Sequence, residues 1–71
     1  MKKLLKMYGL NSDMQYFEII VESVINGQMQ QAKDQFKALP KENKKQFITS
    51  ISTYWNSGLD KKDISMFISI I

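Results

Sequence analysis

Four residues that interrupt helices divide the chain into short segments, and this division constrains the fold most. They are Gly9, Gly27, Pro40 and Gly58. Glycine readily takes the left-handed conformation that follows a helix, and proline cannot continue one. Between these points the apolar residues recur every three or four positions, which is the helical period. The sequence therefore predicts an all-α fold, a compact bundle of four to five short helices, in a single domain over residues 1–71.

Residues that cap or stop helices predict the first boundaries. We expect a first helix over residues 2–8. A second begins after Ser12, because Ser12 and Gln15 have the spacing of a capping box, in which each side chain accepts from the other residue's backbone amide. The Asn26-Gly27 pair ends this helix.

The second half of the chain has comparable signals. We expect a third helix over about residues 28–38 and a fourth over about residues 40–56. Pro40 suits the first position of the fourth helix. Asp60 can cap a last helix, with Asp63 at its third position. Residues 64–71 have a strand as their alternative, because isoleucine and phenylalanine favour extended structure, but the capping residues favour a helix.

The predicted core consists of the apolar stripes of these segments. Glu18 and Glu22 lie on the opposite flank of the second helix, where we expect solvent. The residues expected at the centre are Phe17, Ile20, Val24, Ala32, Phe36, Phe47, Ile51, Trp55, Phe67 and Ile68.

The absence of histidine and cysteine excludes most catalytic and metal chemistry. Nucleophile–histidine triads, thiolate or imidazole zinc sites and disulfides all need these residues. Glu18 and Glu22 are four positions apart, as in carboxylate-bridged metal sites, but such sites in helical bundles also use histidine. We therefore expect no enzymatic activity, no metal and no cofactor.

The basic residues are all lysine, and five of them cluster around the junction of the third and fourth expected helices. This cluster is Lys33, Lys37, Lys41, Lys44 and Lys45. Three of them fall near the start of a helix, where the helix dipole is already positive, so an anion or nucleic acid would be attracted there. The alternative is an ordinary solvated surface. Without arginine, bidentate recognition of guanine is excluded.

The last segment is apolar over much of its circumference. Its main stripe is Ile64, Phe67, Ile68 and Ile71, and further apolar residues lie outside this stripe. Two interpretations remain open. The stripe packs in the core, or it forms an interface with a protein partner, including a second copy of the chain in a homodimer.

The apolar stretches fall far short of the about 20 residues that a membrane span needs. The lysine-rich start lacks the long apolar run and the small-residue cleavage site of a signal peptide. We therefore expect a cytoplasmic protein without a membrane partner.

The residues between 14 and 50 carry a resemblance to known proteins. It rests on the runs Tyr16-Phe17-Glu18-Ile19-Ile20 and Asn26-Gly27-Gln28, followed by Phe36, Leu39 and Phe47-Ile48. In these residues the chain is similar to small helical proteins encoded by bacteriophages and other mobile elements of bacteria. The resemblance implies a bacterial or phage-infected cell as the setting and implies no mechanism.

These observations together predict a small, non-enzymatic interaction module. We expect it to bind protein, including itself, through the stripe of the last helix. The alternative is weak electrostatic binding of nucleic acid through the lysine cluster.

Overall fold

The computed structural model describes residues 1–54 and 58–71, and within them the chain contains helices and no strand. In chain order the elements are α1 (Lys2–Tyr8), α2 (Asp13–Ile25), α3 (Met29–Lys37), α4 (Lys41–Thr49), the π-helical segment η1 (Ser50–Tyr54) and α5 (Lys61–Ser69). The predicted all-α class is confirmed for the described residues, and the strand alternative for the last segment is wrong.

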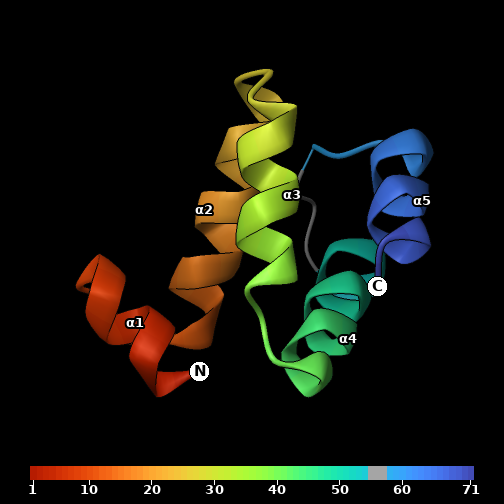
Figure 1. Ribbon diagram of the computed structural model, residues 1–71. Helices are drawn as coiled ribbons and strands as arrows, with labels where there is room; N and C mark the ends of the chain where they lie inside the picture. The colour runs from red at the N-terminus through yellow and green to blue at the C-terminus, as the bar shows by residue number, and fades with distance from the viewer. Residues whose placement is uncertain (55–57) are drawn as a thin grey trace.

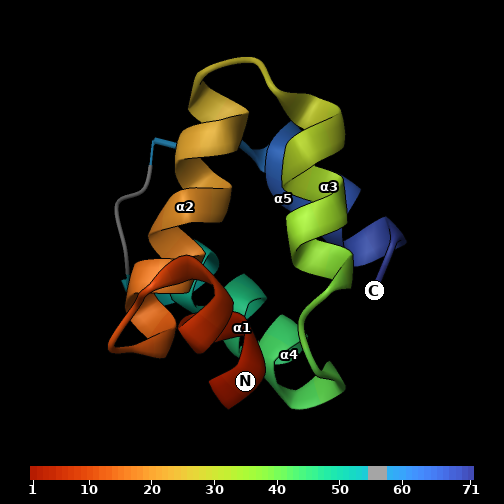
Figure 2. The same cartoon turned by 60° about the vertical axis from the view of Figure 1, so that its left-hand side comes forward.

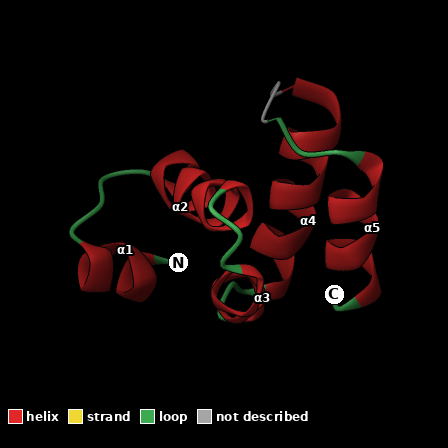
Figure 3. Ribbon diagram, turned by 90° about the horizontal axis from the view of Figure 1, so that it is seen from above, coloured by secondary structure: helices red, strands yellow, loops and turns green. Residues whose placement is uncertain are grey.

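The helices pack around a central hairpin. α2 and α3 run antiparallel in the middle of the molecule (Figure 1 and Figure 2). Figure 3 shows α1 on one side of this pair, and α4 and α5 side by side on the other. The molecule measures 30 × 22 × 21 Å along its principal axes. The core lies where the hairpin meets α4 and α5.

Local signals set the starts of α2 and α5 as predicted. At α2 the Gln15 amide donates to Ser12 Oγ at 3.4 Å, and the Ser12 amide donates to Gln15 Oε1 at 3.3 Å. At α5 the Asp63 amide donates to Asp60 Oδ1 at 3.0 Å, and the Asp60 amide donates to Asp63 Oδ2 at 3.4 Å. Both expected caps are confirmed as reciprocal capping boxes.

The end of α1 requires glycine. Gly9 has a φ of 68°, in the left-handed region that residues with a Cβ rarely adopt. The Leu10 amide donates to the Leu5 carbonyl at 2.8 Å, and the Gly9 amide donates to the Lys6 carbonyl at 3.2 Å. This is a Schellman motif, which satisfies two carbonyls that the helix itself leaves free.

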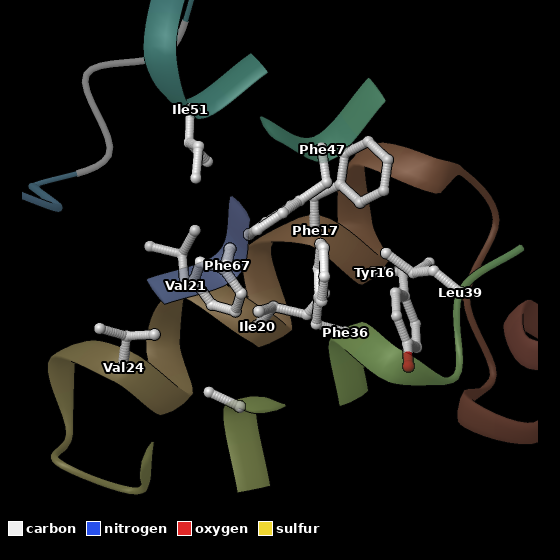
Figure 4. Packing of buried hydrophobic residues seen from close by; sticks show 11 residues of the cluster. Tyr16, Phe17, Ile20, Val21, Val24, Phe36, Leu39, Phe47, Ile51 and Phe67 are labelled. Atoms are coloured by element: carbon white, nitrogen blue, oxygen red, sulfur yellow. The ribbon is translucent and has the colours of Figure 1, made fainter. Parts of the chain in front are cut away.

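The sequence contains four phenylalanines, and they meet at the centre from four different helices (Figure 4). Phe47 of α4 lies 5.4 Å from Phe17 of α2 and 5.1 Å from Phe67 of α5, measured between ring centroids. Phe36 of α3 lies 4.9 Å from Phe67. Edge-to-face and tilted contacts of this kind are favourable beyond the burial of apolar surface. The aromatic cluster therefore joins the hairpin to the α4–α5 pair.

The predicted centre is confirmed at eight positions: Phe17, Ile20, Val24, Ala32, Phe36, Phe47, Ile51 and Phe67 are buried. Ile68 is a wrong prediction, because it is 52% exposed. Trp55 lies outside the described residues. The core also includes Tyr16, Val21 and Leu39. Ile68 points outward because Phe67, on the neighbouring side of α5, occupies the centre.

The fourth helix differs from its predicted extent of about 40–56. Pro40 precedes the helix, since its ψ of 154° is extended and not helical. The α-helix ends at Thr49 and continues as η1. At this change the Ser50 hydroxyl donates to the Gln46 carbonyl at 2.8 Å, where it competes with the backbone amide for the same acceptor. The last two predicted residues of this helix lie outside the described part.

Candidate interaction surfaces

The residues of the predicted interface on the last helix do not share one surface. Phe67 is fully buried in the aromatic cluster, so it has no surface to offer a partner. Ile64 is partly buried and packs against the core. Ile68 and Ile71 are 52% and 51% exposed. The candidate surface on α5 therefore consists of Ile68 and Ile71, with Ile64 at its border.

The inner side of α5 differs from the predicted stripe. Met66 and Ile70, which lie outside that stripe, are partly buried and pack against the core together with Leu59. Ile68, which is 52% exposed, is turned away from this packing, and α5 lies at the outside of the molecule in Figure 3. A helix that is apolar over much of its circumference can pack in more than one rotation. The core around Phe67 selects this one.

The lysine cluster spans the junction of α3 and α4. Lys37, Lys41 and Lys45 are exposed, whereas Lys33 and Lys44 are partly buried. Figure 2 shows that α3 leads into α4 through one short connection, so the end of one helix lies close to the start of the next. The structure thus brings the two halves of the cluster to the same corner of the molecule.

The start of α4 has no capping side chain. Its N-cap residue is Pro40, which makes no side-chain cap hydrogen bond, and Glu42 is the acidic residue of its first turn. Asn43 ties this turn to α2, because its Nδ2 donates to Asp13 Oδ2 at 3.4 Å and to Gln46 Oε1 at 3.0 Å. The corner is therefore a fixed, basic helix start with an exposed rim.

A buried polar network lies between α2 and α3, and composition alone did not reveal it. The Tyr16 hydroxyl donates to the Gln35 backbone carbonyl at 2.8 Å. The Ser23 hydroxyl lies 2.8 Å from Gln35 Oε1, to which it donates, and 3.1 Å from the Ile19 carbonyl. Among the described residues, no buried side-chain nitrogen or oxygen lacks a partner. The network therefore stabilises the hairpin without leaving an unsatisfied group.

Tyr16, a member of this network, has a clearly raised pKa. Burial, with the nearby Tyr8 as the second cause, raises the pKa of Tyr16 to about 12. The Tyr8 and Tyr16 rings meet edge to face at 5.4 Å between centroids, which docks α1 onto α2. Tyr16 is thus a neutral hydrogen-bond donor at physiological pH and has a structural role.

The acidic residues do not form a metal site within residues 1–54 and 58–71, where no cluster of three potential ligands occurs. Glu18 and Glu22 are exposed on α2, as predicted for a solvated flank. In the same described ranges, no helix is long and apolar enough to cross a membrane.

Besides Tyr8, which is 44% exposed, apolar side chains that the sequence analysis did not single out are exposed on α1 and α2. They are Met7 on α1 and Met14 and Ile25 on α2, with 75%, 45% and 61% of their surface exposed.

Comparison with known proteins gives no relative: no family model, no curated protein and no solved structure matches the chain.

Proposed function

We propose that this protein is a small, non-enzymatic module that binds protein, including a second copy of itself, through the outer edge of α5. The observation that carries the proposal is a pair of half-exposed isoleucines, Ile68 on α5 and Ile71 just after its end, with α5 at the outside of the molecule. Burying such side chains against a partner releases about 25 cal/mol per Å² of apolar surface. The partly buried Ile64 connects this edge to the core.

Solution molar mass, measured by light scattering over a hundredfold concentration range, tests this proposal. We expect the mass to rise above the 8.3 kDa of one chain as concentration increases. The rise should persist at high salt, because apolar association depends little on ionic strength. The variant Ile68→Ser should remain at the mass of one chain.

Ile25→Ser is the matched control, because Ile25 is also exposed but lies at the end of α2. It should associate like the unmodified protein. A mass that stays at one chain for all three proteins would contradict self-association, and equal losses in both variants would contradict the location of the interface on α5.

Binding of nucleic acid through the lysine cluster is the second candidate. It is supported by the three exposed lysines around an uncapped helix start, Lys37, Lys41 and Lys45. Such binding should weaken with salt, with a logarithmic slope of roughly −0.9 for each phosphate contacted on duplex DNA. An apolar interface on α5 would not show this slope.

The double variant Lys44→Glu/Lys45→Glu tests the second candidate. If the corner binds nucleic acid, retention of a duplex at low salt should be lost in this variant. Lys2→Glu/Lys3→Glu changes the net charge by the same amount on α1 and should retain the duplex. Equal retention by both variants would remove the candidate.

The cellular setting is also part of the proposal. The resemblance to small phage-encoded helical proteins supports the cytoplasm of a bacterial or phage-infected cell.

A further inference from the structure

The exposed edge of α5 has the spacing of a helix–helix seam. Lys61, Ile64, Ile68 and Ile71 follow one another at intervals of three, four and three residues. The same alternation of three and four residues separates the inward-facing positions of a two-helix coiled coil. Lys61 is exposed, and the isoleucines become more exposed from Ile64 to Ile68. The seam is therefore a continuous line along one side of α5.

The last turn of α5 keeps Ile71 on this line. The Ile70 amide donates to the Phe67 carbonyl at 3.2 Å, and the Ile71 amide donates to the Ile68 carbonyl at 3.4 Å. Both bonds join residues three apart, as in a 3₁₀ turn, where such residues lie above one another. Ile71 therefore lies above Ile68, although the α-helix proper ends at Ser69.

We propose that α5 pairs antiparallel with α5 of a second copy across a two-fold axis, with Ile64 opposite the partner's Ile68 and Lys61 opposite the partner's Ile71. This inference rests on the proposed function and adds the partner, the orientation and the register. In this arrangement the seam is self-complementary, as a two-fold interface requires. Each partly buried isoleucine meets an exposed one, and the axis crosses the seam midway between Ile64 and Ile68.

Charge complementarity selects the antiparallel orientation. The C-terminal end of a helix carries partial negative charge, which a lysine stabilises. Antiparallel pairing places Lys61 beside the last carbonyls of the partner's α5, and the two-fold axis makes this contact twice. Parallel pairing would instead place the two Lys61 ammonium groups together. The same arrangement also sets the helix dipoles in opposite directions.

The size of the seam predicts a weak dimer. One pair of short helices buries far less than the about 1,600 Å² of a standard interface, so we expect a dimer that dissociates on dilution. The interface would therefore respond to protein concentration in the range that light scattering covers.

Cysteine cross-linking tests the register, because the chain contains no cysteine of its own. Two single variants, Ile64→Cys and Ile68→Cys, are prepared with tags of different mass, mixed and oxidised under mild conditions. Disulfides form only when the two Cα atoms approach within about 7 Å. We expect cross-linked dimers in the mixture, and little cross-linking of either variant alone.

The outcomes separate this inference from the proposed function. Cross-linking of each variant with itself, with association intact, would overturn the antiparallel register and leave self-association standing. A protein that stays at the mass of one chain and does not cross-link would overturn both. Circular dichroism of each variant confirms that the helices are retained.

A charge variant tests the orientation without touching the isoleucines. Lys61→Glu should weaken the dimer about tenfold, because it replaces a favourable contact with the partner's helix end by an unfavourable one at two places. Lys62→Glu is the matched control, with the same change in charge one position away from the seam, and should associate normally. Both substitutions should stabilise the α5 helix within one chain, because acidic residues near a helix start interact favourably with the helix dipole. Equal effects in the two variants would overturn the proposed orientation.

Discussion

Gln35 is bonded to α2 through both its backbone and its side chain. Its carbonyl accepts from the Tyr16 hydroxyl, and its side-chain oxygen accepts from the Ser23 hydroxyl. The Leu39 amide, which would bond this carbonyl in a longer helix, donates to the Phe36 carbonyl instead. Tyr16 thus supplies the partner that the end of α3 lacks, and the two bonds fix the position of α3 along α2.

Tyr16→Phe removes the hydrogen bond to the Gln35 carbonyl. The resulting loss of stability should depend on pH, because the pKa of Tyr16 is raised in the folded protein. Near pH 8 the variant should be less stable by about 1 kcal/mol, the usual net value of a buried hydrogen bond. As the pH rises from 10 to about 12, Tyr16 ionises in the unfolded chain before it does in the folded protein. The unmodified protein therefore loses stability in that window, about 1.4 kcal/mol by pH 11.

The stability advantage of the unmodified protein over the variant should consequently fall from about 1 kcal/mol near pH 8 to about zero or slightly below at pH 11. Urea unfolding followed by circular dichroism measures it. A difference that stays constant across this range would show that the pKa of Tyr16 is not raised.

Among the helices, α1 is the least firmly held. None of its residues is fully buried, it has no capping side chain, and its first turn contains lysines and no acidic residue. Lysine at a helix start opposes the helix dipole. α1 is held by the contact of Tyr8 with Tyr16 and by the partly buried Leu4 and Leu5. A helix of seven residues depends on such docking, because it is marginal alone.

Amide hydrogen exchange should therefore be fastest in α1 and slowest in α2 and α3. Lys3→Glu should slow exchange in α1 by about two- to fivefold, because it reverses the unfavourable charge at the helix start. Lys6→Glu is the matched control in the last turn and should speed exchange there. If both variants changed the rates in the same direction, the helix dipole would not explain the low stability of α1.

For the molecule as a whole, the four phenylalanines decide how the helices assemble. Phe67 brings α5 to the hairpin through Phe36 and to α4 through Phe47. A chain of 71 residues buries a small core, so each of these aromatic contacts represents a large share of its stability.

Phe67→Ala should destabilise the protein by about 3–5 kcal/mol, enough to unfold much of a domain this small. Ile68→Ala, at the next position, should change stability by less than about 1 kcal/mol, since Ile68 is half exposed. Thermal unfolding at low protein concentration, where the proposed dimer would be dissociated, compares the two. Similar losses in both variants would contradict the observed rotation of α5.

The sequence by itself determined where α2 and α5 begin and where α1 ends. The capping boxes at Ser12 and Asp60 and the left-handed turn at Gly9 depend on residues within five positions of one another. The stripe of α2 was equally predictable, because polar residues such as Glu18 leave that helix only one apolar side. These features are local, and short-range hydrogen bonding and periodicity suffice to specify them.

Only the tertiary structure decided which residues at the border of the apolar side of α3 are buried and which side of α5 faces the core. Gln35 is a polar residue that periodicity assigns to the surface, and it is buried because Tyr16 and Ser23 of α2 offer it partners. α5 is apolar over most of its circumference, so its pattern leaves the rotation open. The space beside Phe36 and Phe47 accepts Phe67, and this turns Ile68 and Ile71 out to the surface. The burial of Gln35 and the rotation of α5 depend on the shape of the core and on residues distant in the sequence. A local sequence pattern carries no information about either.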